Sequence, residues 1–221
     1  MITVHHLNNS RSQRVLWLLE ELGMPYEIRH YQRNATTSLA PPELLQVHPL
    51  GKAPVITDGD VTVAETGAVI EYLVERAGGR LRPAAGTPEQ RRYTYWLHFA
   101  EGSAMPPLLM TLILGRIRRS GPFFAKPIVR RVADAVTESF VAPNIKRQLE
   151  FMESELQGRP WFTGGEFSAA DVQMSFPLEV AVARGGLDAH YPRLNDWLAR
   201  IHARPAYQQA LKRGGAYTIL R

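Results

Sequence analysis

Residues 48–77 read HPLGKAPVITDGDVTVAETGAVIEYLVERA, and this stretch decides the fold of the first third of the chain. The β runs Pro54–Thr57 and Val61–Ala64 flank the turn 58–60, whose Asp-Gly pair is a strong signal for a β-hairpin. A helix follows over 66–77, which Thr66 can cap, because apolar residues recur on one side. The stretch therefore predicts two antiparallel strands followed directly by a helix.

The residues before this stretch alternate strand and helix. Ile2–His5 and Tyr26–Tyr31 have the β-branched or aromatic composition of strands. Between them, apolar residues from Ser12 to Leu22 are spaced by three and four, which predicts a helix that Gly23 ends. Pro42–Val47 is a short helical turn. Because a strand, a helix and a strand follow one another, we expect a parallel pair beside the antiparallel hairpin.

The remainder of the chain has helical patterns and no strong β signal after residue 83. Thr87 and Gln90 predict a capped helix start, and Ser168 with Asp171 predicts a second one. Pro106-Pro107 and Pro143 should kink or break the long helices that contain them. We expect three parts of the chain: an α/β domain at 1–79, a linker at 80–87 and an all-α domain at 88–221.

Composition excludes several classes of protein. Apolar residues make up 45% and charged residues 21% of the 221, as in soluble globular proteins rather than disordered ones. Cysteine is absent, so there is no disulfide and no cysteine nucleophile, and a cytoplasmic location is expected. The chain has no run of about 18 apolar residues, so we expect no membrane-spanning helix. The histidines have no ligand spacing, since His5 and His6 point to opposite faces of a strand, so we expect no metal.

The net charge of +5 is concentrated in the second part of the chain. No acidic residue lies between Met105 and Ala133, and six basic residues do: Arg116, Arg118, Arg119, Lys126, Arg130 and Arg131. Such a stretch can be a solvated helix face, a site that concentrates a small anion, or a nucleic-acid site. No recognition helix or repeated aromatic platform accompanies it, so we predict that it binds no nucleic acid.

Three loops of the first domain are candidates for one shared site. The segments 9–14 and 65–66 each begin a helix, where free N–H groups and the helix dipole favour anions. The segment 48–54 has glycine, lysine and a proline directly before a strand, as in a tight turn with a cis bond. Unpaired backbone there can hold an extended peptide as an added strand. Together the loops predict a site for a small peptide-like anion.

These segments resemble the cytosolic glutathione S-transferase superfamily. The similarity lies in residues 8–27, in residues 48–54 and in residues 65–73, with Gly164–Asp171 similar to the capping segment of the family's second domain. The resemblance implies an α/β N-terminal thioredoxin-like domain, an all-α C-terminal helical domain and a homodimer. It also implies a reaction in which the sulfur of glutathione attacks a small hydrophobic electrophile.

The resemblance assigns roles to individual residues. Ser10 matches the catalytic serine of theta-like and delta-like members, which donates a hydrogen bond to the sulfur; Ser12 is its rival, and Tyr31 or Tyr95 is a weaker one. The other residues that it places at glutathione are Lys52, Ala53, Pro54, Glu65, Thr66 and His48. For the electrophile site between the domains we name Leu7, Asn9, Met105, Leu109 and Phe123. Glu101 is interpreted as a solvated charge.

Three further functions stay open at this stage. The first is glutathione-dependent reduction of a disulfide or peroxide, in which two glutathiones supply both sulfurs because the chain has no cysteine. The second is glutathione-dependent isomerisation or dehalogenation. The third is a non-catalytic interaction protein on the same fold, since a fold alone does not fix a function.

Overall fold

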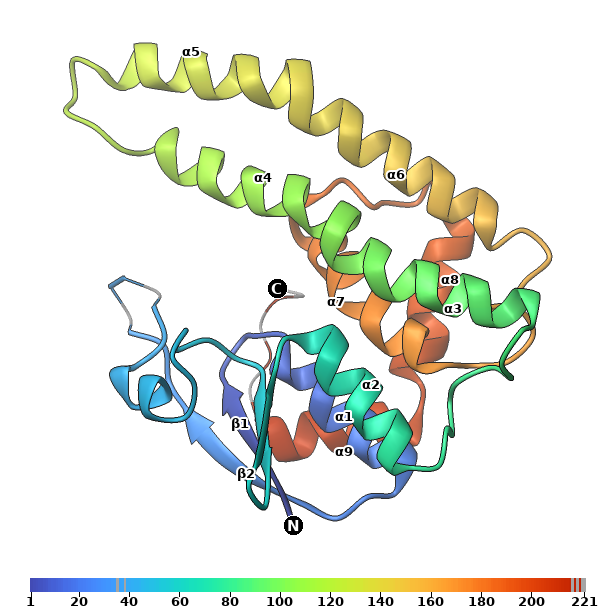
Figure 1. Ribbon diagram of the computed structural model, residues 1–221. Helices are drawn as coiled ribbons and strands as arrows, with labels where there is room; N and C mark the ends of the chain where they lie inside the picture. Colours follow the sequence, from blue (N-terminus) through green and yellow to red (C-terminus); the bar gives the residue numbers. More distant parts are fainter. Residues whose placement is uncertain (35, 38, 216, 218, 220–221) are drawn as a thin grey trace.

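The computed structural model describes residues 1–34, 36–37, 39–215, 217 and 219 of the chain. A small sheet with helices beside it is followed by a larger group of helices (Figure 1). The elements in chain order are β1 (Ile2–Leu7), α1 (Ser12–Leu22), β2 (Tyr26–Tyr31), a 3₁₀ helix (Pro42–Gln46), β3 (Val55–Asp58), β4 (Val61–Ala64), α2 (Thr66–Arg76), α3 (Pro88–Phe99), α4 (Met105–Ile117), α5 (Lys126–Val136), α6 (Ala142–Glu155), α7 (Ala169–Arg184), α8 (Pro192–His202) and α9 (Pro205–Gly214).

The four strands form one mixed sheet in the order β2-β1-β3-β4. β1 runs parallel to β2, with Ile2 opposite Tyr26, and antiparallel to β3, with Val4 opposite Ile56. The hairpin of β3 and β4 then leads directly into α2, as the sequence predicted. Val4 and Ile56 are fully buried, because α1 and α2 cover this sheet. The first domain is therefore thioredoxin-like, and the domain after it is helical.

Where the prolines predicted a kink or a break, the helices are continuous and contain a wider, π-helical turn. α3 and α4 are joined through a π-helical turn, Ala100–Ala104, directly before Pro106-Pro107. Proline has no N–H for the carbonyl four residues earlier, which for the second proline is that of Ser103. Gln148 Nε2 donates to this carbonyl at 2.9 Å and replaces the missing donor. A second π-helical turn, Thr137–Val141, joins α5 to α6 before the proline of α6 in the same way.

The helix caps of the second domain follow the sequence closely. Thr87 Oγ1 accepts the backbone N–H of Gln90 at 3.2 Å, whereas the Gln90 side chain accepts from the N–H of Gly86 rather than from Thr87. Ser168 and Asp171 form the full capping box at the start of α7. Asp171 is fully buried and also accepts from the Phe162 N–H and the Trp197 indole, so it serves the packing of the helical domain.

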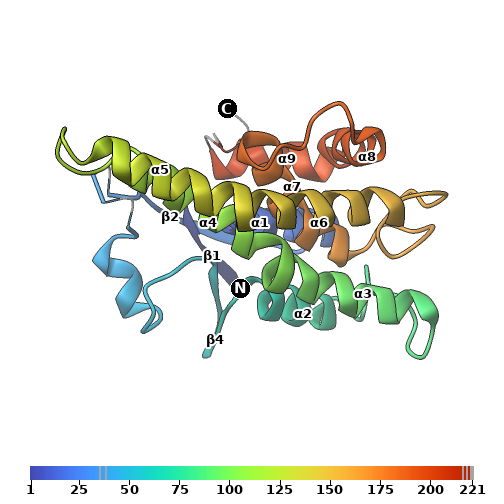
Figure 2. The same ribbon diagram turned by 90° about the horizontal axis from the view of Figure 1, so that it is seen from above.

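The last helix returns to the first domain. α9 packs along α1 (Figures 1 and 2), and Arg213 Nη1 reaches Glu20 at 3.0 Å. At Gly214 an added Cβ would lie 2.8 Å from the Leu16 side chain, so glycine permits the close approach of the two helices. One hydrophobic core extends through both domains as a result. The limits of the linker between the two domains, predicted at residues 80–87, stay a prediction.

One helix of the described chain is long and apolar enough to cross a membrane by length and composition alone. It comprises α3, the π-helical turn and α4, with a mean hydropathy of 1.2 in its most apolar window. The sequence expectation overlooked it, because its apolar residues are interrupted by polar ones. Trp96, Ala100 and Leu108 lie in the core between the helices, and 39% of this window is buried.

Candidate active site

The three loops named from the sequence meet at one cavity of about 220 Å³. The loop before α1, the loop before β3 and the junction of β4 with α2 each contribute to its wall, and the π-helical turn of the second domain closes it. Its lining is Arg11, His48, Leu50, Lys52, Ala53, Pro54, Ala64, Glu65, Thr66 and Glu101. All six residues that the sequence placed at glutathione besides Ser10 are in this set.

The loop before β3 presents free backbone to the cavity. The Ala53-Pro54 bond is cis, as the sequence indicated. The paired register of β3 begins at Val55, so the Ala53 backbone lies outside the ladder. His48 Nδ1 accepts the Leu50 N–H at 3.3 Å, which shapes the turn and leaves the ring at the wall of the cavity. Extended backbone without a neighbouring strand can pair with a peptide-like ligand.

The junction of β4 and α2 corrects one prediction. Thr66 does not cap α2; it is the first residue of the helix, and Glu65 occupies the cap position with φ of 70°. A side chain other than glycine is disfavoured in this left-handed region, and such positions cluster at functional sites. Glu65 is exposed at the cavity, whereas Thr66 is buried beneath it and accepts from Arg14 Nη2 at 3.5 Å.

Ser10 is not in the lining of the cavity, although its neighbour Arg11 is. Its side chain is 3% exposed, and its Oγ is 2.7 Å from both the Leu7 carbonyl, to which it donates, and Ser12 Oγ. Ser12 is fully buried and is 2.9 Å from His6 Nδ1. Burial and the neighbouring His30 lower the pKa of His6 to about 4, so this ring is neutral at pH 7. Both serines therefore belong to an internal network that holds the loop before α1.

The sequence missed an ion-pair network at the cavity. Glu101 was interpreted as a solvated charge, but it accepts from Arg11 Nε at 3.1 Å and from Arg14 Nη2 at 2.6 Å. Burial raises the pKa of Glu101, but the charges and hydrogen bonds of Arg14 and Arg11 outweigh it and hold the pKa below its usual value. Arg14 is buried and also donates to the Gln173 carbonyl. Residues 11 and 14 are far from residue 101 in sequence, so no spacing could reveal this contact.

The residues named for the electrophile site differ in their exposure. Leu7 and Met105 are 2% and 5% exposed and lie in hydrophobic cores, which favours a packing role, and their assignment to the electrophile site stays a prediction. Leu109 is half exposed on α4, and Phe123 lies in the loop between α4 and α5 with 85% of its surface exposed. Asn9 is half-buried in the loop before α1, with φ of 49°. Roles of Leu109, Phe123 and Asn9 at the electrophile site likewise stay predictions.

The alternative sulfur donors also lie apart from the cavity lining. Tyr31 Oη is 3.0 Å from His5 Nδ1, and Tyr95 stacks on Phe99 in α3. Within the described part of the chain, no three His, Asp or Glu side chains are grouped as metal ligands.

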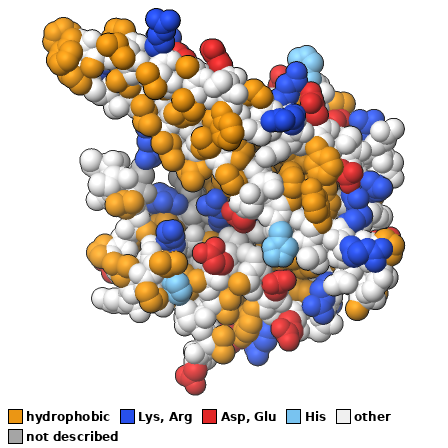
Figure 3. Space-filling model, turned by 45° about the horizontal axis from the view of Figure 1, so that its top comes forward, with side chains coloured by type: hydrophobic (Ala, Val, Ile, Leu, Met, Phe, Trp, Pro, Cys, Tyr) orange, Lys and Arg blue, Asp and Glu red, His pale blue; other side chains and the backbone are white. Residues whose placement is uncertain are grey.

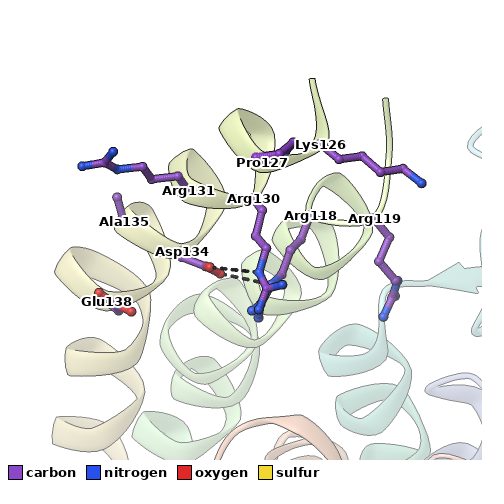
Figure 4. A pocket seen from close by; sticks show the side chains of 9 residues that line it. All are labelled: Arg118, Arg119, Lys126, Pro127, Arg130, Arg131, Asp134, Ala135 and Glu138. Carbon is purple, nitrogen blue, oxygen red and sulfur yellow. Dashed lines mark ion pairs between the residues drawn. The ribbon is translucent and has the colours of Figure 1, made fainter. Parts of the chain in front are cut away.

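The basic stretch forms an open hollow of about 890 Å³ between α4 and α5. Arg118 and Arg130 point to Asp134, at 3.2 and 3.7 Å (Figure 4). Arg119, Lys126 and Arg131 point in other directions, and all three are exposed. With its central cations paired, this surface has the character of a solvated face with a positive field around it.

The fold and the cavity define a class of protein: a thioredoxin-like domain that binds a small peptide-like anion, joined to a helical domain. Comparison with known proteins leads to the same class. Residues 1–75 match the N-terminal domain of glutathione S-transferases, and residues 129–200 match their C-terminal domain.

The similarity to whole proteins covers nearly the full chain. The chain is 34% identical to glutathione S-transferase 3 of Schizosaccharomyces pombe, over 96% of this chain and 88% of that protein. The chain is 33% identical to glutathione S-transferase 1 of Saccharomyces cerevisiae, over 98% of this chain and 96% of that protein. The crystal structure of a glutathione S-transferase from Actinobacillus pleuropneumoniae superposes on this chain with a TM-score of 0.81 and 32% identity. The superposition covers 100% of this chain and 96% of that structure. The chain belongs to the glutathione S-transferase family, and it is a glutathione transferase.

Proposed function

We propose that glutathione lies across the cavity with its γ-glutamyl end at Glu65 and Thr66. Its cysteinyl backbone then pairs with Ala53, and its glycyl carboxylate meets Lys52 beside His48. The convergence of these residues on one cavity of about 220 Å³ is the observation that carries the proposal. Their chemistry is complementary to the ligand, because Glu65 suits the ammonium group and Lys52 suits a carboxylate.

The sulfur then lies at the N-terminus of α1. A free thiol with a pKa near 8.5 is only about 3% ionised at pH 7, so the site has to stabilise the thiolate. The resemblance gives this role to the Ser10 hydroxyl, but its single proton has the Leu7 carbonyl and Ser12 as partners. We therefore assign the larger share to the N–H groups and dipole of the first turn of α1 and to the Arg11 guanidinium at the cavity.

The reaction follows from this placement. The thiolate attacks an electrophilic carbon, the new carbon–sulfur bond replaces the bond to the leaving group, and the leaving group departs with the electron pair. Reduction of a disulfide is the second candidate, and it requires a second glutathione to supply the other sulfur because the chain has no cysteine. Isomerisation, dehalogenation and a purely non-catalytic role are the remaining candidates, and the glutathione-affinity column described below tests the last of them.

The assignment of the thiolate site has a direct test. Thiolate absorbance of bound glutathione is titrated in the wild type, in Ser10→Ala and in the matched control Ser12→Ala. If Ser10 donates directly, removing a hydrogen bond to a charged group should raise the thiol pKa by about 1–2 units. If the helix N-terminus stabilises the thiolate, the thiol pKa should rise by less than about 0.5 unit in both variants. A large shift in Ser10→Ala alone overturns our assignment and restores the serine.

Binding of glutathione itself is tested separately. We expect the wild type to be retained on a glutathione-affinity column and Glu65→Gln to be retained more weakly, because the ammonium group loses its carboxylate. A wild type that passes through the column contradicts the proposed binding mode and favours the non-catalytic alternative.

The proposal extends to the setting of the enzyme. We propose a cytoplasmic homodimer that conjugates small electrophiles in detoxification, without nucleic-acid or membrane partners and without a metal. The absence of cysteine suits a reducing compartment. The pairing of Arg118 and Arg130 with Asp134 leaves fewer unpaired cations in the basic hollow for a nucleic acid.

A further inference from the structure

The hairpin of α4 and α5 projects from the helical domain, and its second helix carries an exposed apolar stripe (Figure 1). The stripe consists of five large apolar side chains spaced by four residues, each with 36–70% of its surface exposed: Phe124, Ile128, Val132, Val136 and Phe140. We propose that α5 of a second copy of the chain crosses α5 on this stripe, with a two-fold axis at Val132. The inference rests on the proposed homodimer and deepens it, because it names the surface that forms the dimer.

The apolar stripe has no cover within the described part of the chain. There α5 has extensive contacts only with α4 and with the π-helical turn that continues it. Phe124 lies in the turn before α5 and Phe140 in the π-helical turn after it, so the stripe follows the whole helix. Figure 3 shows hydrophobic side chains gathered on this projecting part. Helices in proteins are stabilised mainly by packing of their apolar face, and large exposed apolar patches mark interaction sites.

The charges of α5 lie away from the apolar stripe. All four line the basic hollow, which none of the five stripe residues does (Figure 4): Lys126, Arg130, Arg131 and Asp134. Two copies of a chain with a net charge of +5 repel each other, and like charges that meet in an interface are costly. Because the stripe itself is uncharged, two copies can approach each other there without that cost.

The sizes of the five side chains are symmetric about the centre of the apolar stripe. Phenylalanine stands at both ends, Ile128 and Val136 come next, and Val132 is in the middle. Residues four apart form an inclined ridge on a helix, and two such ridges that interlock set the helix axes at about 50°. Crossed helices are closest at the crossing point and diverge on either side, so small side chains suit the middle and large ones the ends. A two-fold axis at Val132 then pairs Phe124 with Phe140 and Ile128 with Val136 of the other copy.

The area of the apolar stripe agrees with what a stable dimer needs. The exposed fractions of the five side chains amount to roughly 500 Å² of apolar surface, at about 150–200 Å² for each whole side chain. An interface of standard size buries about 800 Å² on each partner, and in homodimers about 65% of it is apolar. The stripe therefore supplies the apolar centre of such an interface.

A charge at the central position gives the first test. Val132→Arg places two like charges at the two-fold axis. Val182→Arg is the matched control, because Val182 is 43% exposed on α7 and the change of charge is the same. Sedimentation velocity over a range of concentrations should show a dissociation constant that is at least about 100-fold higher in Val132→Arg and unchanged in Val182→Arg. An unchanged dissociation constant in Val132→Arg overturns the inference.

Cross-linking tests the geometry itself, and the absence of cysteine from the chain makes each introduced thiol unique. Val132→Cys should form a disulfide with its own copy under mild oxidation, because a residue on a two-fold axis meets itself. After subunit exchange, Ile128→Cys and Val136→Cys should link to each other faster than either links to itself. Val182→Cys should stay unlinked. If Val132→Cys is linked no faster than Val182→Cys, the inference is overturned, whether or not Val132→Arg folds.

The outcomes separate this surface from the proposed function. If the wild type is a dimer and Val132→Arg is one as well, the proposed homodimer stands and only this inference fails. If the wild type is a monomer of 24.9 kDa, both fail. A monomer that binds phosphatidylcholine vesicles and loses them in Val132→Arg assigns the stripe to a membrane surface, which also overturns the inference. The glutathione-affinity column tests the binding of glutathione separately.

Discussion

Replacing Glu101 by Gln should destabilise the folded protein, because Arg14 depends on this carboxylate. The Arg14 side chain is 2% exposed, and its Nη2 is 2.6 Å from Glu101 Oε1. Its Nε already lacks a hydrogen-bond partner among the described residues. Removing one partner of a fully buried pair costs about 3–5 kcal/mol. Glu101 itself is 34% exposed, so water screens part of the loss and we expect about 2 kcal/mol.

Urea unfolding of the wild type, Glu101→Gln and the control Arg11→Gln measures this cost. Arg11 contacts the same carboxylate, but its side chain is 33% exposed, so its loss should cost less than about 1 kcal/mol. We expect the urea midpoint to fall clearly in Glu101→Gln at an unchanged m-value. If Arg11→Gln costs as much as Glu101→Gln, the buried Arg14 does not depend on Glu101 and the reasoning is refuted.

The stability difference between the wild type and Glu101→Gln should also depend on pH. The pKa of Glu101 in the folded protein lies below its ordinary value of 4.5. Its contribution to the free energy of unfolding is therefore fully present above that ordinary value and is lost as pH falls through the lowered one. The difference should be constant from pH 6 to 8 and should narrow only in acid. Narrowing near neutrality would contradict the assignment.

Three further predictions concern other parts of the molecule. Glu65→Gln should raise KM for glutathione by about tenfold and change kcat little, since the ammonium group is remote from the sulfur; steady-state kinetics at varied glutathione checks this, and an unchanged KM contradicts it. Glu179→Gln should lower the free energy of unfolding by about 2 kcal/mol in urea titrations, because the buried carboxylate accepts from the hydroxyls of Tyr207 and Tyr217 at 2.6 Å each. An unchanged free energy of unfolding would refute the stabilising role of Glu179. Light scattering at micromolar concentration should give a dimer, and a 24.9 kDa particle would exclude it.

Local signals in the sequence predicted the elements well, for reasons that lie within each element. The Asp-Gly turn before Val61–Ala64, the helical spacing that ends at Gly23, and the capping box of Ser168 and Asp171 are all settled by neighbouring residues. At the prolines the sequence predicted a kink or a break, and the structure has no break but a π-helical turn. Whether a helix breaks or widens there depends on a donor such as Gln148, which comes from another helix.

The site shows the same division. The resemblance selected residues of three loops, and six of them line one cavity, because each loop is fixed by its own strand or helix end. The orientation of a hydroxyl is not fixed in this way. Ser10 turns to the Leu7 carbonyl because that acceptor is within 2.7 Å in the folded loop, a contact that no pattern of residue types contains.

By itself the sequence determined the order of strands and helices, an α/β part followed by a helical part, and the loops that form the site, because hydrophobic spacing, caps and turns are local properties. The resemblance to a known family added that the first domain is thioredoxin-like. Only the tertiary structure decided which distant charges meet. Glu101 binds Arg11 and Arg14, and α9 packs on α1, because packing of the two domains brings together residues that the chain separates. Contacts of this kind depend on the complementary shapes of packed helices, which are fixed only when the whole core has formed.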